Sequence, residues 1–156
     1  MSAAIPPARR APARPAVAPS GASGAGGGAL VPAGYRFAVL VPVRTTGQNA
    51  REHPMVRAKR IKAERSAVRM CLNARSLRCP LSPPLDVVLT RISSSRMDSD
   101  GVVGALKHTR DEIAAWMGID DRHDDLVRYL YVQEKGPRGA FAVRIEIKPR
   151  SQSNAP

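Results

Sequence analysis

Acidic residues are crowded into one short part of an otherwise basic chain. The stretch 97–125 holds eight of the thirteen aspartates and glutamates, although the formal net charge of the 156 residues is +12. Carboxylates this close together repel one another unless a cation lies among them, and in proteins that cation is usually a divalent metal ion. A basic surface beside a metal-sized acidic cluster indicates a site where a phosphate backbone is bound and cut.

Two pairs of aspartates are the candidate metal ligands. Asp98 and Asp100 lie two residues apart in a predicted loop, where extended backbone points both side chains to the same side. Asp120 and Asp121 follow a predicted turn at Gly118 and precede the next predicted strand. Three carboxylates delivered from these two loops would form a Mg²⁺ site, with water and phosphate oxygens as the remaining ligands.

A lysine is predicted to lie above these carboxylates. Asp100, Lys107 and Asp111 are spaced so that they fall on one face of a continuous helix. That helix is predicted over 101–117, with Asp100 as its N-cap residue and Gly118 just after its end. Lys107 can then contact either the carboxylates or a bound phosphate.

The same acids also have ordinary structural interpretations. Asp98 and Asp100 can be turn and N-cap residues, and Asp111 can form a surface ion pair with Lys107. The remaining acids are interpreted as solvated surface residues: Glu112, Asp124 and Asp125.

Hydrophobic periodicity predicts a small α+β domain. Strands are expected at 35–43, 85–92, 126–133 and 140–148, and helices at 55–77 and 101–117. The order β-α-β-α-β-β gives one sheet with two helices packed against it. The glycine-containing turn at 135–139 is expected to join the last two strands as a β-hairpin.

The domain is expected to occupy 35–148, between two disordered ends. Residues 1–34 are almost all Ala, Pro, Gly, Ser and Arg, with no acidic or aromatic residue, so this segment cannot bury enough apolar surface to fold. Residues 149–156 are also expected to be disordered. An acid-free segment that contains arginine is also compatible with an organelle transit peptide.

The composition excludes several classes of protein. No apolar run approaches the ~20 residues needed to span a bilayer, so no membrane association is expected. The two cysteines make no disulfide framework, and together with three scattered histidines they lack the spacing of a zinc site. The chain is therefore expected to work in a reducing cytoplasm.

The excess of basic residues favours an anionic partner, with nucleic acid first. Residues 51–78, which include the first predicted helix, contain nine Lys and Arg against two acids. Surplus arginine that serves only solubility is the alternative interpretation. The candidate contacts to a DNA backbone are Arg57, Lys59, Arg60, Lys62, Arg65, Arg69 and Arg96.

The order of these motifs resembles the RusA family of Holliday junction resolvases, over roughly 35–148. In that family a D-x-D-N motif opens a helix that carries a lysine and a further aspartate, and a glycine and a hydrophobic-Asp-Asp element follow. The corresponding residues here are DSDG at 98–101, Lys107, Asp111, Gly118 and Ile119-Asp120-Asp121. Upstream, a strand ending in VPV, a polar loop with Asn49 and a basic helix also agree with the family.

The resemblance implies a Mg²⁺-dependent endodeoxyribonuclease, with Mn²⁺ able to substitute, that resolves four-way DNA junctions by paired cuts. It implies a homodimer that acts in recombination or repair of phage or prophage DNA in the bacterial cytoplasm. Asp98, Asp100 and Asp121 match the family's metal-binding aspartates, with Asp120 as a neighbouring helper. Lys107 would neutralise charge on the reacting phosphate, and Asn49 would contact the DNA.

Two positions depart from the family pattern. Gly101 stands where the family has asparagine, and Gly104 stands where it has lysine, with Lys107 one turn further along. A catalytically inactive protein of the same fold that binds junctions or other nucleic acid is therefore the alternative. A basic scaffold or RNA-associated protein, whose aspartates are only caps and loop residues, is a third interpretation.

Overall fold

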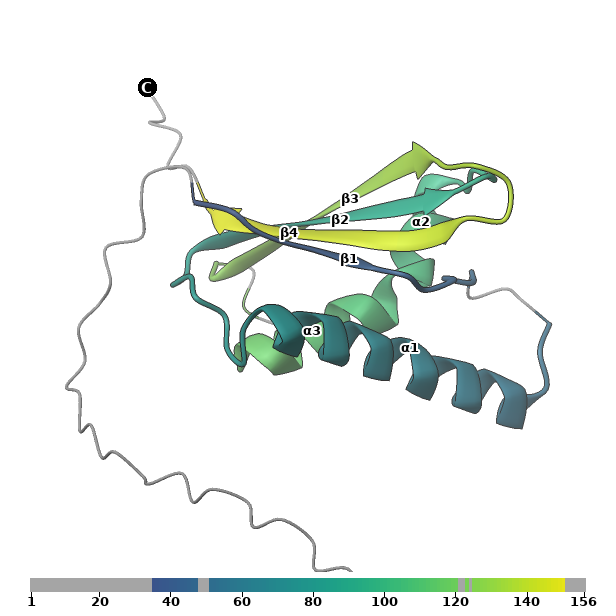
Figure 1. The fold of residues 1–156 in the computed structure, drawn as a ribbon, viewed down its shortest axis with the longest axis horizontal. Coiled ribbons are helices and arrows are strands. Elements are labelled where there is room, and N and C mark those ends of the chain that lie inside the picture. The colour runs from purple at the N-terminus through teal and green to yellow at the C-terminus, as the bar shows by residue number, and fades with distance from the viewer. Residues whose placement is uncertain (1–34, 48–50, 121–122, 124, 151–156) are drawn as a thin grey trace, which may run out of the picture. The chain divides into compact units, whose positions relative to one another are not determined.

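The computed structural model describes residues 35–47, 51–120, 123 and 125–150. This part of the chain is an α+β domain, which confirms the predicted fold class (Figure 1). Its elements are β1 (Phe37–Val41), α1 (Pro54–Arg75), β2 (Leu85–Ser93), α2 (Ser99–Ala105), α3 (Lys107–Met117), β3 (Val127–Lys135) and β4 (Phe141–Pro149). β4 extends one residue past the predicted boundary at 148, because Pro149 pairs with Leu85 of β2, and the Arg150 side chain donates a hydrogen bond to the Asp125 carbonyl. The predicted tail 1–34 and Asn49 lie outside the described residues.

The four strands form one mixed sheet in the order β1-β4-β2-β3. β4 pairs antiparallel with both β1 and β2, whereas β2 and β3 are parallel. Parallel neighbours need a crossover connection, and α2 and α3 supply it between the end of β2 and the start of β3. The carboxyl end of β2 therefore leads directly toward the candidate acidic residues.

The predicted hairpin of the last two strands is wrong, because β2 lies between β3 and β4. The connection at 136–140 crosses the end of β2. There the Gly136 N–H donates a 3.0 Å hydrogen bond to the Ser93 carbonyl. Seven of the nine residues of β2 are buried, on both faces of the strand. A strand of this kind is stable in the middle of a sheet, where both of its edges are paired.

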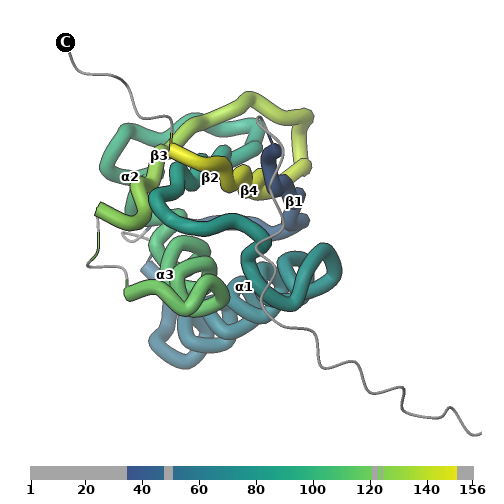
Figure 2. The backbone as a smooth tube through the Cα atoms, turned by 90° about the vertical axis from the view of Figure 1, so that its left-hand side faces the viewer, coloured from purple at the N-terminus to yellow at the C-terminus, as the bar shows by residue number. Residues whose placement is uncertain are grey.

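The helices lie on one side of the sheet and at its edge (Figure 1, Figure 2). α1 and α3 pack against each other on this side, and α2 lies beside β3. Alternate strand positions point toward the helices and form a core with them. Its fully buried members include Leu72, Leu89, Ile113 and Ile145.

The single helix predicted over 101–117 is two helices, with a break at Leu106. The Leu106 backbone has φ −96° and ψ 3°, which is not helical, while its side chain is fully buried. The residues at 101–104 are two glycines and two valines, which are weak helix formers. Burial of the Leu106 side chain therefore decides the path of the chain here more than helix propensity does.

α1 is the longest described helix and is mainly polar. It has 22 residues and begins at Pro54, after His53, whose Nδ1 accepts a 3.3 Å hydrogen bond from the Met55 N–H. Only Glu64, Val68 and Leu72 are buried along it. Within the described residues, no helix combines the length and the apolar character that crossing a bilayer requires.

A side chain at Gly136 should strain the loop that steps over β2. A Cβ atom there would lie 2.9 Å from Ile92 Cγ2, closer than carbon atoms approach without a shift. We expect Gly136→Ala to lower the free energy of unfolding by about 1–3 kcal/mol, measured by urea denaturation. Gly47→Ala is the control, because its Cβ would make an ordinary 3.6 Å contact with Met97 Cε. Equal effects of the two substitutions would contradict this path of the loop.

Candidate functional site

Asp98 caps α2. Its Oδ1 atom accepts a 3.0 Å hydrogen bond from the Gly101 N–H, and its own backbone is extended. Asp100 lies inside the first turn of the helix, where the positive end of the helix dipole favours a carboxylate. Two expectations are therefore wrong: the N-cap residue is Asp98 rather than Asp100, and the two aspartates do not lie in one extended loop.

Gly101 leaves room for the Asp98 carboxylate in this cap. A Cβ atom at position 101 would overlap the Asp98 Oδ1 atom. An asparagine at this position, as in the family that the chain resembles, would require a shift of the Asp98 carboxylate, which is the end of a flexible side chain. With glycine, Oδ1 holds the helix end and Oδ2 makes no hydrogen bond within the described residues.

Asp100 and Lys107 line one open pocket of about 260 Å³, together with Val103, Gly104 and Arg110. Lys107 is the first residue of α3, so the break between the helices does not keep it from this pocket. Sequence analysis did not identify Arg110 as a site residue. Its position three residues after Lys107, on the same helix face, could have indicated it. One carboxylate and two cations thus surround a space that a phosphate group can enter.

Asp111 pairs with its neighbour rather than with Lys107. Its Oδ1 atom lies 3.3 Å from Arg110 Nη2. Next to it, burial lowers the pKa of His108 more than the Asp111 carboxylate raises it, so the imidazole is mainly neutral at pH 7. Asp111 therefore supports Arg110 and is not brought to the pocket.

The second pair of predicted ligands is only partly described. Asp120 is exposed, and its carbonyl accepts a 3.2 Å hydrogen bond from the His123 N–H. Asp121 lies outside the described residues, and within them no three acidic, histidine or cysteine side chains are grouped to hold a metal ion. Carboxylate oxygens such as Asp98 Oδ2 and those of Asp100 have the chemistry that Mg²⁺ prefers. The full ligand set stays a prediction.

Gln133 on β3 holds the segment that leads to Asp98. Its Nε2 atom donates a 2.7 Å hydrogen bond to the Met97 carbonyl, and its Oε1 atom accepts one of 2.9 Å from the Met97 N–H. Both backbone groups of the residue before the cap are thus fixed by one amide side chain. Sequence patterns gave no sign of this contact, because the two residues are 36 positions apart.

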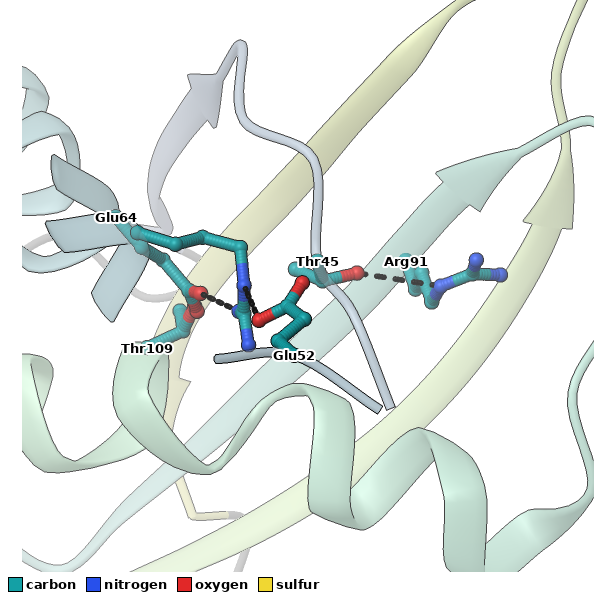
Figure 3. A network of polar contacts seen from close by, with 6 residues as sticks. Thr45, Glu52, Glu64, Arg91 and Thr109 are labelled. Carbon is teal, nitrogen blue, oxygen red and sulfur yellow. Dashed lines mark hydrogen bonds and ion pairs between the residues drawn. The ribbon is translucent and has the colours of Figure 1, made fainter. Parts of the chain in front are cut away.

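Arg91 on β2 holds the same segment two residues earlier. It lies directly opposite Gln133 in the parallel ladder and donates a 2.8 Å hydrogen bond to the Ser95 carbonyl. Its Nε atom also donates to Thr45 Oγ1 at 3.2 Å (Figure 3). The residue is 3% exposed, and burial lowers the pKa of its guanidinium. Sequence analysis did not identify Arg91 as a residue that supports the site. The presence of an arginine in an otherwise apolar strand could have indicated this role.

Arg96 lies at a second open pocket, of about 500 Å³, on the other side of α2. Ser99, Tyr131 and Gln133 line this pocket with it, and Val103 lines both pockets. Arg96 is exposed, as a contact to a DNA backbone requires. The cations Arg96, Lys107 and Arg110 therefore lie around one short helix.

Glu112 is buried, contrary to the expectation of a solvated residue. It is 7% exposed and forms ion pairs with Arg65 at 2.8 Å and Arg69 at 2.5 Å. These partners lie on α1, more than forty positions away, where α3 packs against that helix. Two of the predicted DNA contacts therefore join α1 to α3.

Arg60 is also engaged within the domain. It donates a 3.0 Å hydrogen bond to Glu52, and its Nη1 atom lies 3.8 Å from Glu64 Oε2 (Figure 3). Glu64 is 1% exposed and accepts a 3.1 Å hydrogen bond from the Thr109 hydroxyl. Burial is the main cause that raises the pKa of Glu64, against the opposing effects of Thr109 and Arg60.

Three predicted DNA contacts on α1 remain available. Arg57, Lys59 and Lys62 are exposed and form no ion pair with another described residue. The basic surface of α1 that can meet an external anion is therefore smaller than the charge count suggests.

Removing the Gln133 amide should loosen the segment before Asp98. We expect Gln133→Leu to speed exchange of the Met97 amide hydrogen by about 10-fold or more and to cost about 1–2 kcal/mol of stability. Hydrogen exchange followed by NMR measures the first effect, and urea denaturation the second. Gln133→Glu is the matched control, because it keeps the acceptor for the Met97 N–H. Unchanged Met97 exchange in the leucine variant would contradict the hydrogen bond.

Replacing Glu64 should change how stability depends on pH. Its pKa is raised above the ordinary 4.5, so the folded protein binds this proton more tightly than the unfolded chain does. The resulting stabilisation is complete below about pH 4.5 and is lost as the pH rises through the raised pKa. Glu64→Gln should therefore melt at a higher temperature than the unsubstituted protein at neutral pH, and the difference should shrink toward about pH 4. Calorimetry across this range measures it, and a difference independent of pH would refute the cause.

Comparisons with protein families and with curated proteins give no match from which a function could be transferred. No protein-family model matches the sequence, and no curated protein matches it. The resemblance to the RusA family therefore depends on the short motifs named above. What the site does must be argued from its own residues.

Proposed function

We propose that this chain is a metal-dependent endonuclease that cuts branched DNA at four-way junctions. The observation that carries the proposal is the pocket at α2, where Asp100 lies with Lys107 and Arg110, while Arg96 lies at the pocket on the other side of this helix. A carboxylate at the start of a helix, surrounded by cations, suits a site where a metal ion and a phosphate group are held together. The motif order that resembles the RusA family supports the choice of a junction as substrate.

The chain's residues have distinct roles in this proposal. Asp98 and Asp100 would hold Mg²⁺ or Mn²⁺ together with Asp121 and its neighbour Asp120. These carboxylates would hold an ion that would supply activation of a water for in-line attack and stabilisation of the leaving 3′-oxygen. Lys107 and Arg110 neutralise charge that develops on the reacting phosphate.

Binding to DNA depends on exposed cations and on symmetry. Arg57, Lys59, Lys62 and Arg96 would contact phosphates without reading sequence, so affinity should fall steeply with salt. The resemblance implies a homodimer, and a two-fold dimer suits a junction whose paired strands are cut symmetrically. Recombination or repair of phage or prophage DNA, in the bacterial cytoplasm, is the corresponding setting.

A junction-binding protein that has lost catalysis is the second candidate. The observation that favours it is the cap, because Asp98 Oδ1 is bonded to the Gly101 N–H. A carboxylate that also caps the start of a helix has less freedom to move toward a metal ion. The exposed cations would serve this function equally well.

A labelled synthetic four-way junction tests these candidates. With Mg²⁺, the unsubstituted protein should make symmetric nicks, and Asp100→Asn should reduce the nicking rate about 100-fold or more. Asp98→Asn should reduce it similarly without loss of stability, because asparagine caps a helix as well as aspartate does. Gel analysis of the nicked strands gives the rates.

Asp125→Asn is the matched control for charge. Asp125 belongs to the same acidic stretch, and its side chain is 77% exposed. Nicking by this variant should equal that of the unsubstituted protein. Tight junction binding without nicks in Mg²⁺ or Mn²⁺ would favour the inactive protein, and binding without preference for a junction would favour the basic scaffold.

A further inference from the structure

An open pocket of about 430 Å³ lies at the end of the sheet where β2 begins. Its walls are the end of α3, the start of β2 and the segment that follows α1, which lie together at the left of Figure 1. The apolar side chains that line it include Leu81, Leu85, Trp116, Met117 and Ile119. β2 has nine residues, so about 25 Å separates this pocket from the candidate site at the other end of the strand. None of the residues that line the pocket has a role in the proposed function.

The walls of the pocket are apolar and well packed. Leu85 is fully buried, and the ring of Trp116, which is 5% exposed, lies 5.3 Å from the ring of Phe37. Burial raises the pKa of the Cys79 thiol against the opposing effect of a backbone hydrogen bond with Leu81, so this group is neutral at pH 7. No acidic side chain lines the pocket. A preformed apolar cavity of this size can hold a bulky apolar group.

Two arginines lie at the mouth of this pocket or close to it. Arg78 lines the pocket, and Arg75, three residues earlier, is the last residue of α1. Both are exposed, and neither forms an ion pair with another described residue. The Ser76 hydroxyl donates a 2.6 Å hydrogen bond to the Arg78 carbonyl and so holds this segment in place. Leu77, between the two arginines, is 80% exposed. An apolar cavity and accessible cations are therefore combined on one surface.

We propose that this pocket binds an acidic segment of another protein, with one bulky apolar side chain inside the pocket and carboxylates on Arg75 and Arg78. The charge of the chain, +12, attracts such a segment, and the two arginines complement its carboxylates. The last turn of α3 also lines the pocket, and carbonyl groups in a last turn have no partner within their own helix. The backbone N–H groups of a peptide can donate to them. A peptide therefore supplies the apolar group, the anions and the donors together.

A nucleic acid fits this surface less well than a peptide does. A phosphate backbone can contact the arginines, but it has no apolar group that would fill the pocket. A base inside the pocket would lose the hydration of its donors and acceptors to a mainly apolar lining. The Trp116 ring is buried, so it offers no open face on which a base could stack.

A synthetic acidic peptide tests the proposal with the full chain, without DNA or metal. The probe is a labelled peptide of about ten residues that is rich in glutamate and has one phenylalanine. Trp116 is the only tryptophan of the chain, so its fluorescence reports occupation of the pocket. We expect the peptide to change this fluorescence, and a peptide with alanine in place of phenylalanine to bind about 10-fold or more weakly. Unchanged Trp116 fluorescence at saturating peptide would overturn the proposal.

Two substitutions separate the charge from the cavity. Arg78→Glu should raise the dissociation constant of the peptide, measured by fluorescence anisotropy, about 10-fold or more. Ala115→Phe places a ring in the pocket from an exposed position on α3, and it should weaken binding to a similar extent. Circular dichroism checks that both variants fold. A dissociation constant that Ala115→Phe leaves unchanged would show that the peptide does not use the cavity.

Arg138→Glu is the matched control for Arg78→Glu. Arg138 is exposed in the connection at the other end of the sheet, and its replacement changes the net charge by the same amount. The dissociation constant should stay within about twofold of that of the unsubstituted protein. Equal weakening by the two substitutions would mean that only the overall charge attracts the peptide, and would overturn the proposal.

This inference goes beyond the proposed function and does not depend on it. A single-stranded oligonucleotide of the same net charge should displace the peptide poorly, and displacement as effective as that by unlabelled peptide would assign the pocket to nucleic acid instead. Arg78→Glu and Ala115→Phe should nick junctions at the rate of the unsubstituted protein. Absence of nicking in all of these proteins would leave peptide binding intact, so the two proposals can fail separately.

Discussion

The parallel pairing of β2 with β3 is the constraint on which the rest of the structure depends. Nine residue pairs join the two strands, and a parallel neighbour can be reached only through a crossover connection. The chain between them must therefore leave the carboxyl end of β2, cross over the sheet and return, and α2 and α3 do this. Asp98 and Asp100 lie at the first turn of that crossover because the chain starts it there. Gln133 and Arg91, opposite each other on the two strands, then fix the departing segment.

Buried carboxylates decide how much of the basic helix is free for an external anion. Glu112 and Glu64 lose hydration when α3 packs on α1, and this loss is offset only if cations or hydrogen-bond donors meet them. Arg65, Arg69 and Arg60 supply the cations, and Thr109 supplies a donor. The same arginines therefore stabilise the helix pair and are less available to phosphates. Net charge alone therefore overstates the basic surface that an external anion can reach.

The sequence predicted the fold class and the strands well, because alternating and helical periodicities report which faces are buried. The prediction of a hairpin between β3 and β4 was wrong. A short glycine-containing connection at 135–139 has the same sequence pattern whether the two strands pair with each other or a third strand lies between them. The glycines and valines of 101–104 indicated a weak helix but not that the break would fall at Leu106. Long-range polar contacts such as Gln133 with Met97 have no sequence pattern, because each partner is an ordinary residue in its own segment. Of the candidate site, the sequence therefore predicted the proximity of Asp100 and Lys107 but not the side chains that hold the segment before them, and the full set of acids stays a prediction.

The capping role of Asp98 and its proposed role as a ligand are compatible. A cap needs one carboxylate oxygen, and Oδ1 supplies it to the Gly101 N–H, so the second oxygen is held at a fixed place beside the helix. Where Oδ2 is held at the position that a metal ion requires, the fixed ligand loses less conformational entropy on binding; where it is not, the restraint of the cap hinders binding. The glycine that departs from the family pattern leaves room for this position of Oδ1, which a Cβ atom at position 101 would shift. The departure at Gly101 is therefore compatible with an active site in which the helix end, rather than an asparagine amide, orients the first aspartate.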